Sequence, residues 1–445
     1  MQKRGEKVRR PAPSSIRAGR ADSTLTGVAG LVPFGAFLRQ LGLDAALHDA
    51  FGELKQGSSV VYPMACQMRL LIDANAVGEQ RVFGVESLAA DPLFEKLAGG
   101  TISSIDTIYR DLTRMDEEHN SELERLTAQQ GLDVVSKTQC ERVHCDIDTT
   151  VETVFGNQEG AELGYNPRYR GRPSYHPLLS VVAETGTCVG AKLRPGNTGL
   201  GEDEASLIEK HVRRVRASVP KKTGVVARID SGADCTSILA ALDDIVGTVF
   251  VVKAQLTHDL ALAAMSVEDW TTVEEDADGS ALVQFAELPF QRAEWTKAGR
   301  KFRVVAIRRR DRDTTNQNQL WLHLDYTAQV YITNDETADA IDIATEYDGR
   351  AEIEPLIADL KNCIGIGKVP SLDFDANQAM FLLKLLTRNL VLRYAAEYAP
   401  DLPWRGPWLM RALFRVPGRL TRSGRCTRLH THPASRVHKL LTQLC

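Results

Sequence analysis

Two aspartates stand where apolar segments end, and together they could hold a metal ion. In the segment VHCDIDTT (143–150) side chains alternate, so Asp146 and Asp148 share one face and the apolar residues share the other. The segment GVVARIDSGAD (224–234) predicts a buried strand that ends at Asp230. Carboxylates at the ends of neighbouring strands commonly bind Mg²⁺, although a single aspartate in such a place more often caps the following turn.

A second set of polar residues lies in a predicted helix farther along the chain. At about 100° per residue, offsets of 0, 3, 7 and 14 place one narrow stripe on that helix, made of Tyr347, Arg350, Glu354 and Lys361. Arg350 and Glu354 could form an ordinary ion pair on a solvated face, or Glu354 could be a third metal ligand beside phosphate-binding cations. Pro355 lacks a backbone N–H, so we expect the helix to kink or to begin there.

Composition indicates a soluble protein of several domains. The chain has 445 residues, of which 43% are hydrophobic and 25% charged, and this length predicts about two to four domains. No segment approaches the roughly 20 apolar residues of a membrane span, so no membrane partner is expected. The basic start leads into PAPSS, which is not typical of a signal peptide, and eight scattered cysteines favour a reducing cytosol. Without a GxxxxGK[ST] loop, no nucleotide cofactor is expected either.

Charge is distributed unevenly although the total is nearly balanced, with 54 Lys and Arg against 58 Asp and Glu. The first 20 residues contain seven basic residues and one Glu, and no acid follows Asp401. Basic ends around an acidic middle suit a protein that holds phosphate backbone at its edges. The candidate phosphate-binding residues of the tail are Arg411, Arg415, Arg419 and Arg422. Solvated or disordered termini are the alternative interpretation.

The spacing of apolar residues divides the chain into segments of different predicted secondary structure. Helical spacing dominates the first part, Val-rich strands alternate with amphipathic helices in the middle, and helices return after a β-rich stretch. The expected segments are a flexible basic arm (1–25), a helical N-terminal domain (26–138), the first part of an α/β core (139–261), a β-rich insertion (262–333), the second part of the core (334–400) and a basic C-terminal segment (401–445).

The chain resembles one large group of bacterial insertion-sequence transposases. That group carries a YREK signature with the spacing Y-x2-R-x3-E-x6-K, which is matched here by Tyr347, Arg350, Glu354 and Lys361. Asp148-Thr149 and Asp230 look like the first two members of its DDE triad. The stretch GNQEGAELGYNPRYRGRPSYHPLL (156–179) is similar to one branch of the group. The resemblance covers roughly residues 80–395.

The resemblance implies an α/β fold: an RNase H-like mixed sheet flanked by helices, with a β-rich insertion and an all-helical N-terminal domain (26–138) that would bind DNA. Asp148, Asp230 and Glu354 would bind two Mg²⁺ ions, for which Mn²⁺ can substitute, and Asp146 is the alternative first aspartate. Tyr347, Arg350 and Lys361 would hold DNA phosphates. An aromatic residue of the insertion would stack on a displaced base, and the candidates are Trp295 and Trp270.

The function implied is cut-and-paste DNA transposition. The enzyme would act as an endonuclease at the ends of an insertion sequence and then transfer the cut strands into target DNA. Its partners would be double-stranded DNA, both terminal inverted repeats and target, and a second copy in a synaptic homodimer. We expect it in the bacterial cytoplasm, on the nucleoid when bound to DNA. Two alternatives are a nuclease that cuts without joining and an inactive, domesticated DNA-binding relative.

Overall fold

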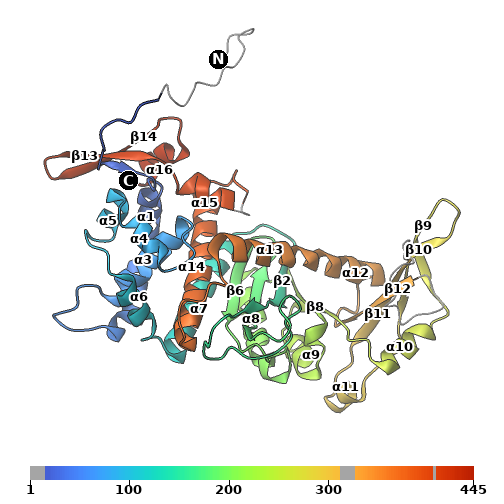
Figure 1. Cartoon of the computed structure of the whole chain (residues 1–445). Coiled ribbons are helices and arrows are strands. Elements are labelled where there is room, and N and C mark those ends of the chain that lie inside the picture. The colour runs from blue at the N-terminus through green and yellow to red at the C-terminus, as the bar shows by residue number, and fades with distance from the viewer. Residues whose placement is uncertain (1–15, 311–325, 404–406) are drawn as a thin grey trace, which may run out of the picture.

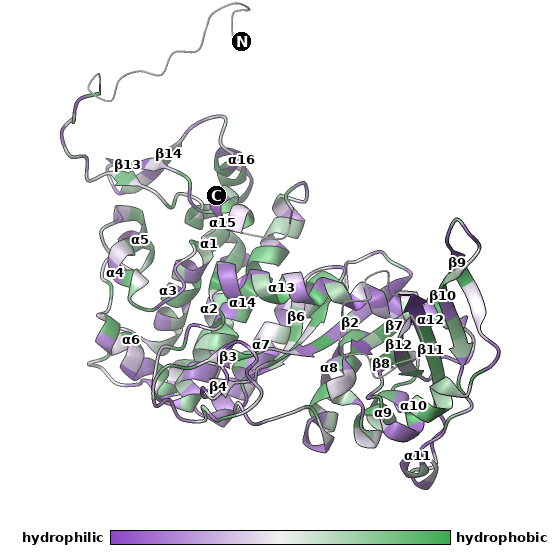
Figure 2. Cartoon of the chain, turned by 45° about the vertical axis from the view of Figure 1, so that its right-hand side comes forward, coloured by the Kyte–Doolittle hydropathy of each residue, from purple (hydrophilic) through white to green (hydrophobic). Residues whose placement is uncertain are grey.

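A computed structural model describes residues 16–310, 326–403 and 407–445. Figure 1 shows a helical part, which contains both ends of the described chain, beside a part built on one large sheet. In Figure 2 hydrophobic segments lie along the strands of the sheet and on the helices packed beside them. No described helix combines the length and the apolar composition needed to cross a membrane.

The helical part is built around one long buried helix, α14 (Phe374–Tyr398). Asp373 caps it by accepting from the N–H of Ala376, and apolar residues on all its sides are buried, as expected of a central helix. The surrounding helices are α1 (Leu31–Gln40), α2 (Leu43–Phe51), α3 (Met64–Ala76), α4 (Gly84–Leu88), α5 (Pro92–Leu97), α6 (Ile105–Leu112) and α7 (Glu117–Val135). They share one hydrophobic core with α14.

The C-terminal segment packs onto the start of the described chain. Its hairpin pairs with strand β1, and α16 lies against α1 (Figure 1). The elements are β1 (Leu25–Thr26), α15 (Pro407–Leu413), β13 (Gly418–Ser423), β14 (Cys426–Thr431) and α16 (Arg436–Leu444). Part of the expected basic arm, residues 1–15, lies outside the described residues.

Within the described residues the large sheet has nine strands, in the order β6-β5-β2-β7-β8-β12-β11-β10-β9. Strand β5 is antiparallel to β2 and β6, whereas β7 and β8 run parallel to β2. This order and these directions are those of an RNase H-like core. The core strands are β2 (Arg142–Thr149), β5 (Leu178–Val182), β6 (Thr187–Lys192), β7 (Gly224–Ile229) and β8 (Thr248–Lys253).

The β-rich stretch after β8 continues the same sheet. Strand β12 pairs antiparallel with β8, so the segment widens the core sheet at that edge. Its elements are α10 (His258–Met265), β9 (Thr271–Glu275), β10 (Ala281–Glu287), α11 (Ala293–Lys297), β11 (Arg303–Arg310) and β12 (Tyr326–Thr333). Residues 311–325, between β11 and β12 in the sequence, lie outside the described residues.

Helices cover both faces of the core, and the alternation predicted for β2 is confirmed. Val143, Cys145 and Ile147 pack with α8 (Ala205–Ser218) and α9 (Thr236–Asp243) in one core cluster. On the other face, α12 (Ala340–Asp348) packs over β7 and β8. That helix continues through a 3₁₀ stretch, η5 (Gly349–Glu352), into α13 (Ile353–Asp359) and a π stretch, η6 (Leu360–Ile364).

Candidate active site

The first two predicted aspartates lie side by side at one edge of the sheet. Strands β2 and β7 are parallel and in register, with Ile147 opposite Ile229. Asp148 and Asp230 follow these two residues directly, so each stands at the carboxyl end of its strand. Adjacent strands lie about 4.8 Å apart, which brings the two carboxylates within reach of a shared cation.

Electrostatics at Asp148 favour a positive partner. Burial raises the pKa of Asp148, Arg350 opposes this change, and the like charge of Asp230 raises the pKa further. Asp230 caps the 3₁₀ turn η4 (Ser231–Ala233), where one of its oxygens, Oδ1, accepts from the N–H of Gly232 at 3.0 Å. Two half-buried carboxylates with oxygens left for coordination match the ligands that Mg²⁺ and Mn²⁺ prefer.

Arg350 occupies the cationic position beside Asp148. It lies in η5, is buried, and donates from Nη2 to Oδ1 of Asp148 at 3.1 Å and to the carbonyl of Ile147 at 3.2 Å. Tyr347 is half-buried next to it, and its ring packs on Tyr331 with centroids 4.8 Å apart. Burial, reinforced by the nearby carboxylates, raises the pKa of Tyr347 to about 12. The predicted Tyr and Arg of the helical stripe therefore do reach the aspartates.

Glu354 lies apart from these residues. Its side chain is exposed in the first turn of α13, which begins two residues before Pro355. The chain is 3₁₀-helical up to Glu352, so the helix changes its winding just before the proline and not at it. The stripe assumed one uniform α-helix, and the 3₁₀ and π stretches on either side of α13 rotate its members relative to one another.

Lys361 contacts the chain just after β2 instead. Its ammonium lies 3.0 Å from the carbonyl of Val151 and 2.9 Å from the carboxylate of Glu152. Within the described residues no group of three or more His, Cys, Asp or Glu side chains gathers as a metal site. The structure thus brings Asp148, Asp230, Tyr347 and Arg350 together, and it leaves Glu354 and Lys361 outside that cluster.

Asp146, the alternative first aspartate, is engaged elsewhere. It is fully buried and binds Arg228 through two hydrogen bonds of 2.6 and 2.8 Å. Arg228 in turn donates from Nη1 to the carbonyl of Glu346 at 2.8 Å. Asp146 therefore positions α12 through Arg228 rather than presenting a free carboxylate. The sequence reasoning missed Arg228, although its placement two residues before Asp230 in a parallel strand set it on the same face.

His144 was also missed as a site residue. Its ring lies between the carboxylates of Glu184, after β5, and Glu346, on α12. Burial alone would lower the pKa of His144, but the two hydrogen bonds outweigh it and raise the pKa to about 9. Its position on the same face as Asp146 was visible in the alternation, whereas its two acidic partners are distant in sequence.

Trp295 does not fit the role of a base-stacking residue. Its side chain is fully buried, with centroids 5.3 Å from Phe302 and 6.3 Å from Phe290. The prediction was wrong because a large ring in a β-rich region is stabilised most by joining the core. Trp270 is partly buried, and the guanidinium of Arg308 covers its ring at 4.1 Å.

The predicted arginines of the tail divide into two pairs. Arg415 donates to the carbonyl of Val77 at 2.5 Å, and Arg419 pairs with Asp22 at 2.8 Å, so both bind the N-terminal half. Arg411 and Arg422 are exposed. Arg422 stands on the β13–β14 hairpin, which projects from the helical part in Figure 1.

An RNase H-like sheet with paired carboxylates at its edge defines the class of metal-dependent enzymes that act on nucleic-acid phosphodiesters. The chain belongs to the transposase DDE domain group 1 family, whose model matches residues 11–445. It is therefore a DDE transposase, an enzyme of metal-dependent DNA cleavage and strand transfer. The resemblance drawn from the sequence motifs is confirmed at this level. No curated protein matches the sequence.

Two solved transposase structures are similar in part. The cryo-EM structure of the piggyBac transposase synaptic complex with hairpin DNA is 9% identical, with a TM-score of 0.43 over 86% of this chain and 79% of that chain. The crystal structure of the Mos1 mariner paired end complex with Mn is 14% identical, with a TM-score of 0.16 over 48% of this chain and 74% of that chain. Likeness this distant says nothing of individual residues.

Proposed function

We propose that Asp148, Asp230 and Glu354 are the catalytic carboxylates with which this transposase cuts insertion-sequence ends and joins them to target DNA. The observation that carries this proposal is the in-register placement of Asp148 and Asp230 at the ends of parallel strands. Glu354 lies outside the cluster of Asp148 and Asp230 in this structure, and it would complete the set from the helix that also delivers Arg350 to Asp148. Its exposed position leaves it accessible to a metal ion and DNA.

Two Mg²⁺ ions, or Mn²⁺ in their place, would supply the activation of the attacking oxygen and the stabilisation of the leaving oxygen. The protein's own groups would bind and orient the DNA. Arg350 has a buried guanidinium beside the aspartates, where a bidentate contact to a phosphate is strong. Tyr347 lines the same place, and Lys361 would hold the next phosphate along the strand.

The remaining parts of the proposal concern partners and place of action. The enzyme would bind terminal inverted repeats and target DNA as a homodimer that pairs two ends, in the bacterial cytoplasm. Exposed Arg411 and Arg422 would add phosphate contacts at the edge of the helical part.

A strand-transfer assay with Mg²⁺ or Mn²⁺ tests the proposal. Asp148→Asn, Asp230→Asn and Glu354→Gln should each lower the cleavage rate by about 10³-fold, because each removes a negative charge that holds the cation. Asp342→Asn is the matched control, since Asp342 is an exposed carboxylate on the preceding helix, α12.

Joined products would support transposition, and cleavage without joining would establish the nuclease alternative. Full cleavage by Glu354→Gln would remove Glu354 from the triad. The same outcome with Asp230→Asn would overturn the site as a whole.

A further inference from the structure

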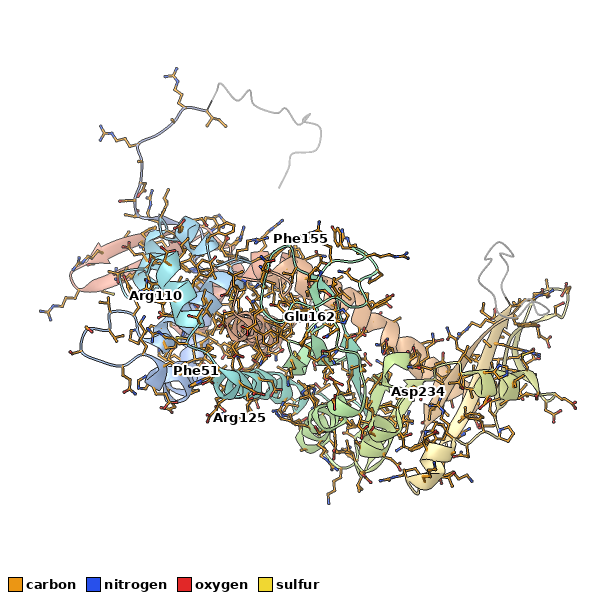
Figure 3. All side chains as sticks on the ribbon, turned by 60° about the horizontal axis from the view of Figure 1, so that its bottom comes forward. Phe51, Arg110, Arg125, Phe155, Glu162 and Asp234 are labelled. Carbon is orange, nitrogen blue, oxygen red and sulfur yellow. The ribbon has the colours of Figure 1, made fainter. Side chains whose placement is uncertain are left out.

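A loop beside the candidate active site carries exposed aromatic rings and arginines whose ring contacts are with one another, on the surface of the loop. This loop, residues 155–172, begins shortly after β2 and is closed at its base by β3 (Glu152–Thr153) and β4 (Ser174–Tyr175). Lys361 contacts Glu152 at that base, so the loop starts where the candidate DNA-binding helix touches the sheet. Figure 3 labels two of its residues, Phe155 and Glu162, in the region between the helical part and the sheet.

Two rings and two arginines form an open cluster on this loop. Phe155 is 69% exposed and Tyr169 is 41% exposed, and their rings meet edge to face with centroids 5.5 Å apart. The guanidinium of Arg168 lies 5.6 Å from the Tyr169 ring, and that of Arg172 lies 5.9 Å from the Phe155 ring. We call these four residues the ring–arginine platform.

The second half of the loop carries charge of one sign, whereas Glu159 and Glu162 lie in the first half. Residues 163–173 contain three arginines and no acidic residue. Among the described residues, the guanidinium groups of Arg168, Arg170 and Arg172 form no ion pair. Arginines that lie near a ring and have no carboxylate partner keep their donors for an incoming phosphate.

The platform is held in place from beneath. Asn166 is only 5% exposed, and its Nδ2 donates to the hydroxyl of Thr153 at 3.0 Å, which ties the loop to β3. Its Oδ1 accepts from the N–H of Tyr169 at 3.0 Å, which sets the turn that carries this ring. The loop is therefore ordered before a ligand binds, which reduces the conformational entropy lost on binding.

We propose that the ring–arginine platform binds unpaired DNA bases next to the cleavage site, with a base stacked on Phe155 or Tyr169 and its phosphates on Arg168 and Arg172. This inference rests on the proposed function and assigns the base-stacking role to a loop other than the β-rich stretch. A DNA end that is being cut or joined exposes bases that have lost their pairing partners. An exposed aromatic ring beside the carboxylates offers these bases a surface on which to stack.

Chemistry favours unpaired bases over intact duplex. A base inside a duplex is already stacked on both sides, so an aromatic face offers it nothing, whereas an unpaired base gains a stacking partner. Phe155 has no hydrogen-bonding group with which to read a groove. An exposed ring of this kind instead accepts any base, and arginines nearby supply backbone affinity.

The test compares binding of the full-length protein to a short single-stranded oligonucleotide that carries 2-aminopurine and to the same sequence as a duplex, both without divalent metal. Phe155→Ala and Tyr169→Ala should each weaken single-strand binding about 10-fold and reduce the quenching of 2-aminopurine. Duplex affinity should stay within about twofold, because the basic residues that bind backbone are unchanged.

Matched controls lie on the same loop. Tyr165 is 76% exposed but lies outside the ring pair, so Tyr165→Ala should bind single strands like the wild type. Arg170→Ala should weaken binding less than Arg168→Ala or Arg172→Ala, because Arg170 is not over a ring. Asn166→Ala keeps both rings but loosens their support, and it should reduce the fluorescence change while the protein stays folded.

Three results would overturn the platform. The first is unchanged single-strand binding by Phe155→Ala and Tyr169→Ala. The second is an equal loss on duplex, which would make the loop a general DNA contact. The third is a change of mass by light scattering in these variants, which would make the loop a contact between two copies. Normal cleavage with any of these results leaves the proposed function intact, whereas a wild type that binds neither DNA would refute both.

Discussion

The two carboxylates of β2, Asp146 and Asp148, share one face of the strand and have opposite fates. Asp146 is fully buried and makes two short hydrogen bonds to Arg228. Asp148 keeps a side-chain exposure of 15%, and its Oδ1 alone accepts both from Arg350 at 3.1 Å and from the N–H of Thr149 at 2.8 Å. Arg228 binds both carboxylate oxygens of Asp146, whereas Asp148 keeps an oxygen available for a metal ion.

The origin of this difference is the place from which each arginine comes. Arg228 stands directly opposite Asp146 on the adjacent parallel strand, where the sheet fixes the geometry of a bidentate pair. Arg350 arrives from the 3₁₀ stretch of a helix that crosses the strand end. A carboxylate near a metal site can serve as a ligand only where the protein leaves its charge incompletely neutralised.

Removing each carboxylate should separate these roles most clearly. Asp146→Ala leaves Arg228 buried without its partner, which should cost about 3–5 kcal/mol of folding free energy. Asp148→Ala also takes a carboxylate from Arg350, but this guanidinium keeps the carbonyl of Ile147 and the nearby charge of Asp230, so stability should fall less than in Asp146→Ala while cleavage is lost. Thermal unfolding of both variants, run beside a cleavage assay, measures this contrast. Equal falls in Tm would show that Asp146 and Asp148 contribute equally to stability and do not have separate roles.

A glycine on the helical side tests the contact that Arg228 makes with α12. A Cβ on Gly349 would lie 2.5 Å from Nη1 of Arg228, so Gly349→Ala must displace either the guanidinium or the chain. We expect a loss of about 1–3 kcal/mol, the usual range for overpacking, and weaker cleavage because Arg350 follows directly. Gly199→Ala is the control, since no atom lies within 4 Å of its Cβ position. Wild-type stability in Gly349→Ala would mean that Arg228 does not fix this helix.

Most of the correct predictions from the sequence came from the alternation of side chains along single strands. Period-two spacing placed Val143 and Ile147 on the core face of β2, and it placed the aspartates opposite. The pairing of Asp148 with Asp230 followed from two strands that end alike. These predictions succeeded because they depend on the backbone of single strands.

The misses depend on contacts between distant segments. The helical stripe failed at Glu354 because the winding changes from 3₁₀ to α beside Pro355. Trp295 went into the core because Phe302 and Phe290 surround it, and the sequence alone does not show such neighbours. The bond of Asp146 to Arg228 requires the register of two strands that lie 82 positions apart.

A smaller, pH-dependent effect should come from the amino-terminal half of β2, where His144 links Glu184 to Glu346 of α12. Because the pKa of His144 is raised from 6.5 to about 9, its contribution is complete below pH 6.5 and is lost as the pH rises through about 9. The loss should be about 1 kcal/mol, since the side chain is 19% exposed and solvent screens its pairs.

Tm measured from pH 6 to pH 10 tests this contribution. The wild type should lose more stability above pH 8 than His144→Gln does, because glutamine carries no charge to lose. His258→Gln, at an exposed histidine of α10, should follow the wild-type curve. If His144→Gln also follows it, the two carboxylates do not depend on a charged imidazole, and Arg228 together with the ion pair of Arg142 and Glu346 would tie α12 to this half of the strand. If the curves separate as expected, a charged His144 helps Arg142 and Arg228 to hold α12 against the half of β2 that contains Asp146, while the half that contains Asp148 is left free for chemistry.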